Sequence, residues 1–425
     1  MKTFRKALSI FLCILTVFSC TAFAFAAPET ADTASVALTD EDYLVVKGRT
    51  LYNKKGEHVQ LKGVNLGAWL TREDWLCPDH IPEGEQYDGE YIYDTLEERF
   101  GREKAKELMD MYYENWITEW DLDNIKAKGF NCVRVPFWYR NFYYEDKGTK
   151  ILDENGEWDF SVLDWVVEEC RERGLYVILD MHGAVGSQSD APHSGRAFQG
   201  AQLYEQSERG EEYRRLTKEL WTAIAERFNG NPAVAMYDLL NEPMCDVECT
   251  EIDRRVKNEW IYGILYDTVR AVDEDHIITM EAIWTGFALP KTFLKGWKNI
   301  VYQVHFYNNN DFIFNFFLLL TIFLHPNVPL MVGEFYPHQK TTWENCFNTM
   351  NKLDYSWMLW TYKATGHGMW SSDWCMYGAK DGFWRADIAN GTYDEIAEAW
   401  SAERLNTQTG FQDTGHFAAN VEAHL

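Results

Sequence analysis

Eight short apolar runs, separated by longer segments with helical periodicity, constrain the fold of this chain more than any other feature. Strands that alternate with helices pair in parallel, because a crossover must carry the chain back across the sheet. The runs occupy residues 59–66, 131–137, 176–182, 234–241, 276–283, 299–306, 329–334 and 355–362. They predict an α/β fold, a (β/α)8 barrel over residues 43–403, with its chemistry at the carboxyl ends of the strands.

Two of the intervening segments have the pattern of outer barrel helices. Residues 161–173 and 211–229 repeat apolar side chains three and four positions apart, which places them on one helical face. The first segment stops at Gly174 and the second at Asn229-Gly230, as helices commonly do. Both are expected to pack on the outside of the sheet.

The ends of the chain are expected to lie outside the barrel. Residues 27–42 are small and polar, as in a linker. Residues 43–47 and 58–61 flank the turn residues 53–56 and predict a short β-hairpin. Residues 404–425 form a C-terminal tail without clear periodicity.

The first 26 residues have the features of a secretory signal peptide. Three basic residues precede an apolar stretch over 7–18, and an Ala-Phe-Ala cleavage site follows at 24–26. An alternative is lipoprotein processing, which would leave Cys20 acylated and the protein anchored. Because Phe18 fits that cleavage box badly, we expect release to the extracellular space.

The charge of the chain limits its partners. Its 40 basic and 66 acidic residues give a formal net charge of −26, which opposes binding to nucleic acid or anionic membranes. A neutral partner remains, and 18 tryptophans make stacking on sugar rings a reasonable expectation.

The cysteines do not indicate a metal protein. Seven of the nine lie beyond the signal peptide, and an odd number leaves a free thiol unless two chains pair through it. No CxxC pair and no HExxH motif occurs. We therefore expect neither a metal nor another cofactor.

One segment, residues 312–324, is almost wholly apolar. It is too short to span a bilayer. We expect an outer helix that is buried on all sides or lies at an oligomer contact; docking at a membrane surface is the alternative.

Two glutamates mark the expected active site. The fourth run ends in YDLLNEP (237–243) and the seventh in PLMVGEF (329–335), so Glu242 and Glu334 reach the same rim of the barrel. Two facing carboxyl groups can cleave a glycosidic bond: one protonates the leaving oxygen, while the other attacks the sugar. A single glutamate at this place would more often form a salt bridge on the rim.

Six other side chains near the strand ends could support this pair: Arg134, His182, Asn241, His305, Tyr307 and Trp360. Arg134 can keep a carboxylate ionised, and the Asn241 amide can bond a sugar hydroxyl. Each also has a structural alternative, an ion pair or a core position. Glu281, with Trp284, reaches the rim as well and either contacts substrate or only shapes the rim.

In this order, these residues and the two glutamates resemble glycoside hydrolase family five, whose members are retaining enzymes, over residues 44–400. The resemblance implies that Glu242 is the acid/base and Glu334 the nucleophile. It also implies that Asn241 and His182 contact sugar, that His305 and Tyr307 orient the catalytic groups, that Arg134 supports Glu334, and that Trp360 floors a subsite.

Within that family, LKGVNLGAWL (61–70), HGAVGSQ (182–188) and HSGR (193–196) resemble the exo-β-1,3-glucanase branch. The resemblance implies a secreted O-glycosyl hydrolase acting on a neutral β-glucan. An endo-β-1,4-glucanase or mannanase on the same barrel is one alternative, and a noncatalytic carbohydrate-binding barrel is another.

Overall fold

The computed structural model describes residues 36–73, 75–82, 88–283, 286–307, 310–337, 340–366 and 375–425. The expected signal peptide, most of the 27–42 linker and Trp284 lie outside these ranges. No helix in the described ranges is long and apolar enough to cross a membrane.

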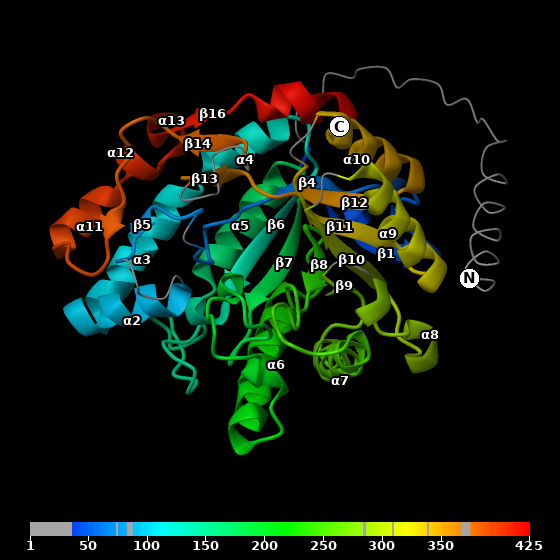
Figure 1. Ribbon diagram of the computed structural model, residues 1–425, viewed down its shortest axis with the longest axis horizontal. Helices are drawn as coiled ribbons and strands as arrows, with labels where there is room; N and C mark the ends of the chain where they lie inside the picture. Colours follow the sequence, from blue (N-terminus) through cyan, green and yellow to red (C-terminus); the bar gives the residue numbers. More distant parts are fainter. Residues whose placement is uncertain are drawn as a thin grey trace, which may run out of the picture. The chain divides into compact units, whose positions relative to one another are not determined.

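The described chain folds around a closed barrel of eight parallel strands (Figure 1). In chain order the strands are β4 (Lys62–Asn65), β6 (Cys132–Trp138), β7 (Tyr176–Gly183), β8 (Val234–Asp238), β9 (Ile277–Glu281), β10 (Ile300–Phe306), β11 (Leu330–Phe335) and β12 (Ser356–Leu359). Each strand pairs with the next one of this series, and β12 closes on β4. The predicted (β/α)8 barrel and all eight of its strands are confirmed.

Helices surround the barrel and fill the connections between strands. The longer ones are α2 (Gly89–Phe100), α3 (Arg102–Trp116), α4 (Glu119–Ala127), α5 (Ser161–Glu172), α6 (Glu208–Phe228), α7 (Glu251–Arg270), α9 (Asp311–Leu324), α10 (Lys340–Leu353) and α11 (Tyr393–Ala399); the short ones are α8 (Thr292–Lys295), α12 (Ala402–Leu405) and α13 (Thr407–Gly410). Both helices predicted from periodicity are present as α5 and α6. The Ser207 side chain starts α6 by accepting a hydrogen bond from the Gly210 amide.

The prediction of an N-terminal hairpin is wrong in the number of strands. This region forms an antiparallel sheet of three strands rather than two. Its strands are β1 (Leu44–Lys47), β2 (Thr50–Asn53) and β3 (His58–Val59), in that order. The expected turn at 53–56 joins β2 to β3. A second turn at Gly48, in the left-handed region with φ 66°, joins β1 to β2. β2 buries only Leu51 and Asn53, so its sequence lacks a strong apolar signal.

The C-terminal residues pack on the barrel domain. β16 (Phe411–Asp413) adds an antiparallel strand to β14 (Tyr377–Ala379), which pairs with β13 (Lys363–Ala364). The remaining short strands, β5 (Asp79–His80) and β15 (Ala386–Asp387), pair with each other. Beyond β16, Phe417 is buried against Phe130, and the Lys62 ammonium donates to the His424 carbonyl oxygen over 2.9 Å.

The apolar helix α9 differs from the expectation that it is buried on all sides. Only Phe314, Leu318 and Thr321 are buried, whereas Phe312 and Phe323 are each 73% exposed. A helix of the outer layer rests on its sheet through one face, and the buried positions follow the helical repeat. α10 covers a second side, where Asn315 and Asn345 hydrogen-bond over 3.1 Å (Figure 1).

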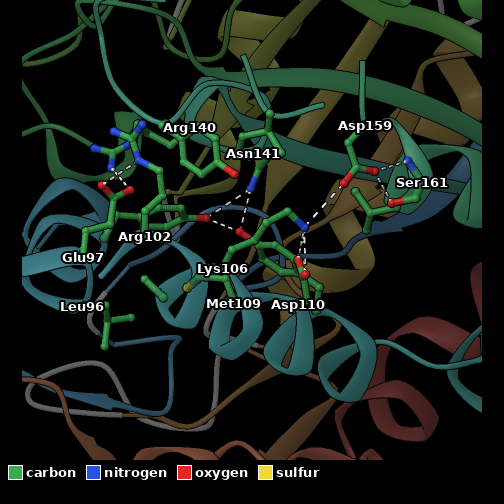
Figure 2. Close-up of a pocket in the computed structure, with 16 residues that line it drawn as sticks. Leu96, Glu97, Arg102, Lys106, Met109, Asp110, Arg140, Asn141, Asp159 and Ser161 are labelled. Carbon is green, nitrogen blue, oxygen red and sulfur yellow. Dashed lines mark hydrogen bonds and ion pairs between the residues drawn. The ribbon is translucent and has the colours of Figure 1, made fainter. Parts of the chain in front are cut away.

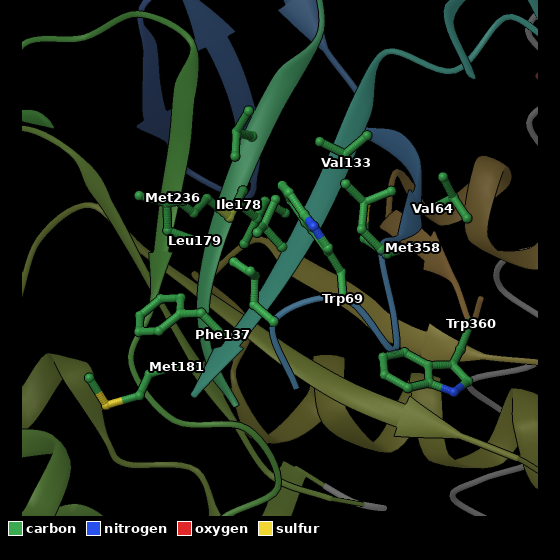
Figure 3. Packing of buried hydrophobic residues seen from close by; sticks show 14 of the residues in the cluster. Val64, Trp69, Val133, Phe137, Ile178, Leu179, Met181, Met236, Met358 and Trp360 are labelled. Carbon is green, nitrogen blue, oxygen red and sulfur yellow. The ribbon is translucent and has the colours of Figure 1, made fainter. Parts of the chain in front are cut away.

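Side chains from successive strands fill the barrel and its walls, with Val64, Val133, Ile178, Met236 and Met358 among them (Figure 3). Little room is left between neighbouring strands. A Cβ placed on Gly63 of β4 would overlap the backbone carbonyl oxygen of Cys132 on β6.

We predict that Gly63→Ala lowers the free energy of unfolding by about 2 kcal/mol or more, because the overlap is with backbone and no rotamer change relieves it. Gly263→Ala on α7 is the matched control. Its Cβ would meet only Trp297, at 3.8 Å, and alanine favours a helix by up to ~1 kcal/mol. Urea unfolding measures both; equal stability of the two variants would contradict the packing described here.

Candidate active site

The two predicted catalytic glutamates meet at the carboxyl end of the barrel. Glu334 lies on β11, and Glu242 lies four residues beyond the end of β8. The backbone of Glu242 has φ 39°, in the left-handed region that residues other than glycine rarely adopt. Both carboxyl groups are largely buried, at 7% and 4% residue exposure.

One imidazole lies between the two carboxyl groups and fixes their separation. Nδ1 of His305 is 2.8 Å from Glu242 Oε1 and 3.4 Å from Glu334 Oε2. These two oxygens are therefore at most 6.2 Å apart. Retaining glycosidases hold their carboxyl groups at about 5–5.5 Å, whereas inverting enzymes need about 6.5–9.5 Å for a water molecule.

Glu334 is held by two donors. Arg134 donates from Nη1 to Oε1 over 2.7 Å, and the Tyr307 hydroxyl donates to Oε2 over 2.6 Å. Both oxygens of Glu334 therefore accept a hydrogen bond, and the one from the guanidinium is charge-assisted. Burial, and after it the negative charge of Glu334, raises the pKa of Tyr307. The phenol therefore keeps its proton and remains a hydrogen-bond donor.

Arg134 is the hub of the site and is fully buried. Besides Glu334, it donates to Asp238 (2.9 Å) and Asn241 (2.8 Å), and it forms an ion pair with Asp180 (3.1 Å). Burial opposes its positive charge, but Asp180, Asp238 and Glu334 outweigh that cost and raise the pKa of Arg134. Its charge is therefore permanent.

A chain of hydrogen bonds orients Asn241. Its Oδ1 accepts from Arg134, and its Nδ2 lies 3.3 Å from His182 Nε2. Nδ1 of His182 lies 2.7 Å from Asp180, so the Nδ1–H tautomer satisfies both contacts. Trp360 stacks on His182 at 5.6 Å between ring centroids, and little of Trp360 is exposed. All eight predicted site residues thus meet in one network.

Glu281 is the last residue of β9 and is completely buried beside Glu242. Its Oε2 accepts from the Glu242 backbone amide over 2.6 Å, and its Oε1 lies 3.2 Å from His305 Nδ1. Burial, together with Glu242 and Asp238, raises the pKa of Glu281. Glu281 is a positioning residue for the unusual backbone of Glu242.

The sequence did not single out several further members of the site. Asp180 and Asp238 flank Arg134, and burial raises the pKa of each to about 7. On the opposite side of Glu242, His193 Nε2 lies 3.5 Å from Oε2, and the Cys245 thiol hydrogen-bonds the carboxylate. The spacing of Asp180 and His182, two residues apart on β7, was a usable signal, because such residues share one face of a strand.

Two hollows lie outside this site. The smaller, about 60 Å³, lies between α2 and α3, and Lys106 there bonds Asp110 (2.8 Å) and pairs with Asp159 (3.5 Å) (Figure 2). The larger, about 760 Å³, adjoins it and is lined by Trp69, Trp120 and Trp165 among others. Glu242 and Glu334 line neither, and Lys106 neutralises the facing acids, so neither hollow offers the acid and nucleophile pair.

Comparison with known proteins agrees with this geometry. A family model described as cellulase (glycosyl hydrolase family 5) matches residues 99–366, which is more than half of the chain. The chain belongs to glycosyl hydrolase family 5. The match confirms the family expected from the residues at the strand ends.

Among curated relatives, a beta-xylosidase of Phanerodontia chrysosporium is 29% identical over 268 residues, covering 63% of this chain and 52% of its own length. A probable glucan 1,3-beta-glucosidase A of Neosartorya fischeri is 28% identical, covering 62% and 59%. The chain therefore spans only somewhat more than half the length of these relatives.

Solved structures agree with the fold. The rutinosidase from Aspergillus niger superposes with a TM-score of 0.57 at 16% identity, covering 74% of this chain and 95% of that one. An endogalactoceramidase gives a TM-score of 0.55 at 17% identity, covering 84% of each chain. At these identities the similarity concerns the barrel alone.

We predict that His182 and His305 remain neutral at pH 5. Burial disfavours the imidazolium and lowers the pKa of His182 to about 4 and that of His305 to about 3. Between pH 8 and pH 5 neither ring should give the signals of an imidazolium in histidine-selective NMR, with His182→Gln and His305→Gln providing the assignments. Protonation of either ring near pH 6.5 would contradict the burial described here.

Proposed function

We propose that the protein is a secreted retaining β-glycosidase that hydrolyses β-linked glucan, most specifically β-1,3-glucan and the short β-glucosides derived from it. Glu242 is the acid/base and Glu334 the nucleophile. The observation that carries this proposal is the 6.2 Å upper limit on the separation of their oxygens, set by His305.

The first step uses the two carboxyl groups in opposite states. Protonated Glu242 gives its proton to the glycosidic oxygen, and ionised Glu334 attacks the anomeric carbon as the carbon–oxygen bond breaks. The products are the free alcohol and a glycosyl ester on Glu334. Arg134 and Tyr307 support this division, because both bond the carboxylate that must be ionised.

The second step returns both groups to their starting states. Glu242, now ionised, takes a proton from water as the oxygen attacks the anomeric carbon, and the ester bond to Glu334 breaks. Asn241 is held by Arg134 and His182, so its amide can bond a sugar hydroxyl at a fixed angle.

The substrate and the location rest on other observations. The relatives named glucan 1,3-beta-glucosidase support β-1,3-glucan, and the negative net charge suits a neutral polysaccharide. The basic, apolar and Ala-Phe-Ala segments within residues 1–26 support secretion.

The test is hydrolysis of laminarin beside barley glucan, carboxymethylcellulose, mannan and an aryl β-glucoside, with product lengths followed over time. We expect laminarin and the aryl glucoside to be cleaved, with glucose alone in the first minutes. A ladder of oligomers would indicate endo action. Preferred cleavage of carboxymethylcellulose or mannan would contradict the proposed linkage.

Two matched variants test the roles. Glu334→Gln should lower turnover of the aryl glucoside by at least ~10³-fold while ligand binding persists, because the amide cannot attack. Glu242→Gln should still form the glycosyl ester on Glu334, but only from a substrate with an activated leaving group that departs without a proton. If the wild-type protein binds β-glucan but cleaves none of these substrates, the barrel is a binding protein.

A further inference from the structure

Three side chains at the acid/base have donor atoms that suit a thiophilic cation. They are the Nδ1 or Nε2 nitrogen of His193, a carboxylate oxygen of Glu242 and Sγ of Cys245, all within 4.8 Å of one another. We propose that these residues bind a divalent cation of the Zn²⁺ class and that the bound cation blocks the acid/base. The block rests on the function proposed above, whereas the binding does not.

The spacing approaches that of a tetrahedral site. Zinc lies about 2.0–2.3 Å from nitrogen, oxygen and sulfur ligands, which places neighbouring ligands of a tetrahedron about 3.3–3.8 Å apart. His193 Nε2 and Glu242 Oε2 are already 3.5 Å apart. Three protein ligands leave the fourth position for water, as in other zinc sites with an open position.

Main-chain hydrogen bonds tie the two ligand-bearing loops together. His193 lies in the short helix Pro192–Ser194, and the amide of the nearby Asp190 donates to the Cys245 carbonyl over 3.0 Å. Within the other loop, the Cys245 amide donates to the Glu242 carbonyl over 3.1 Å. The ligands therefore come from a prearranged pair of loops, which reduces the ordering cost of binding.

The local charge also favours a cation. The carboxyl groups of Asp246 and Glu242 interact electrostatically with both His193 and Cys245. The carboxyl group of Glu281 interacts electrostatically with Cys245 as well. Burial first, and these acids next, raise the pKa of the Cys245 thiol, so cation binding must displace one proton from sulfur. Burial lowers the pKa of His193, which leaves its imidazole neutral and able to ligate.

A second trio, Glu242, Glu281 and His305, has comparable spacing but suits the cation less well. It contains no sulfur, and Nδ1 of His305 already bonds Glu242. His193 keeps 17% of its side chain exposed, whereas Glu281 and His305 have none exposed, so the first trio is more open to solvent than the second. In the first trio the cation would bind a carboxylate oxygen of Glu242, the proposed proton donor.

The experiment titrates ZnCl₂ into the full chain and follows two readouts, equilibrium dialysis of Zn²⁺ and turnover of an aryl β-glucoside. We expect one bound Zn²⁺, inhibition over the same concentration range and recovery on adding a chelator. Cys245→Ser should weaken binding and inhibition by about tenfold or more, because it removes the thiolate ligand. Each rate is compared with the metal-free rate of the same variant.

Cys249→Ser is the matched control, since that cysteine lies four residues away and outside the trio. It should bind Zn²⁺ like the wild type. His193→Gln provides a second route to the same loss if Cys245→Ser does not fold. Co²⁺ in place of Zn²⁺ should give a thiolate charge-transfer band that Cys245→Ser abolishes and Cys249→Ser retains.

Unchanged Zn²⁺ affinity in both Cys245→Ser and His193→Gln would overturn the site. Cysteine-dependent binding without any measurable turnover would leave the site standing and refute the proposed hydrolysis. Binding at the site without inhibition would refute the block on Glu242.

Discussion

The burial of the Arg134 guanidinium at the centre of the barrel mouth is the constraint on which the site depends. A fully buried charged group is tolerated only when each of its donors has a hydrogen-bond acceptor and its charge is balanced by opposite charges nearby. Here Asp180, Asp238 and Glu334 supply the charge, and Asn65 and Asn241 supply further acceptors. These five partners come from four strands, β4, β7, β8 and β11, or from the loop directly after β8, so this one cation links half of the strands of the barrel.

The two sides of the mouth differ in a way that suits two catalytic roles. Glu334 accepts hydrogen bonds from the Arg134 guanidinium, a permanent positive charge, and from the Tyr307 hydroxyl. Glu242 faces His305, His193 and Cys245, none of which carries a permanent positive charge. His305 touches both carboxyl groups, and its low pKa of about 3 keeps it a neutral spacer between them.

The barrel and the central pair could be predicted because both leave local patterns. Each strand is one apolar run, and Glu242 and Glu334 stand at the ends of two of them. The second strand of the N-terminal sheet could not be predicted, because only two of its residues, Leu51 and Asn53, are buried. The exposed face of α9 could not be predicted either, since a segment of thirteen residues that is almost wholly apolar does not reveal which side the sheet covers. The contact that Glu281 makes could not be predicted, because its partner is the Glu242 backbone, which no sequence motif records.

The central claim is that His305 holds Glu242 and Glu334 close enough for double displacement at the anomeric carbon. Proton NMR of the first sugar released from an aryl β-glucoside, recorded before mutarotation, tests it most directly. The account predicts the β-anomer first, with the α-anomer growing in later. Initial release of the α-anomer would mean inversion, and the geometry described here would not explain the reaction.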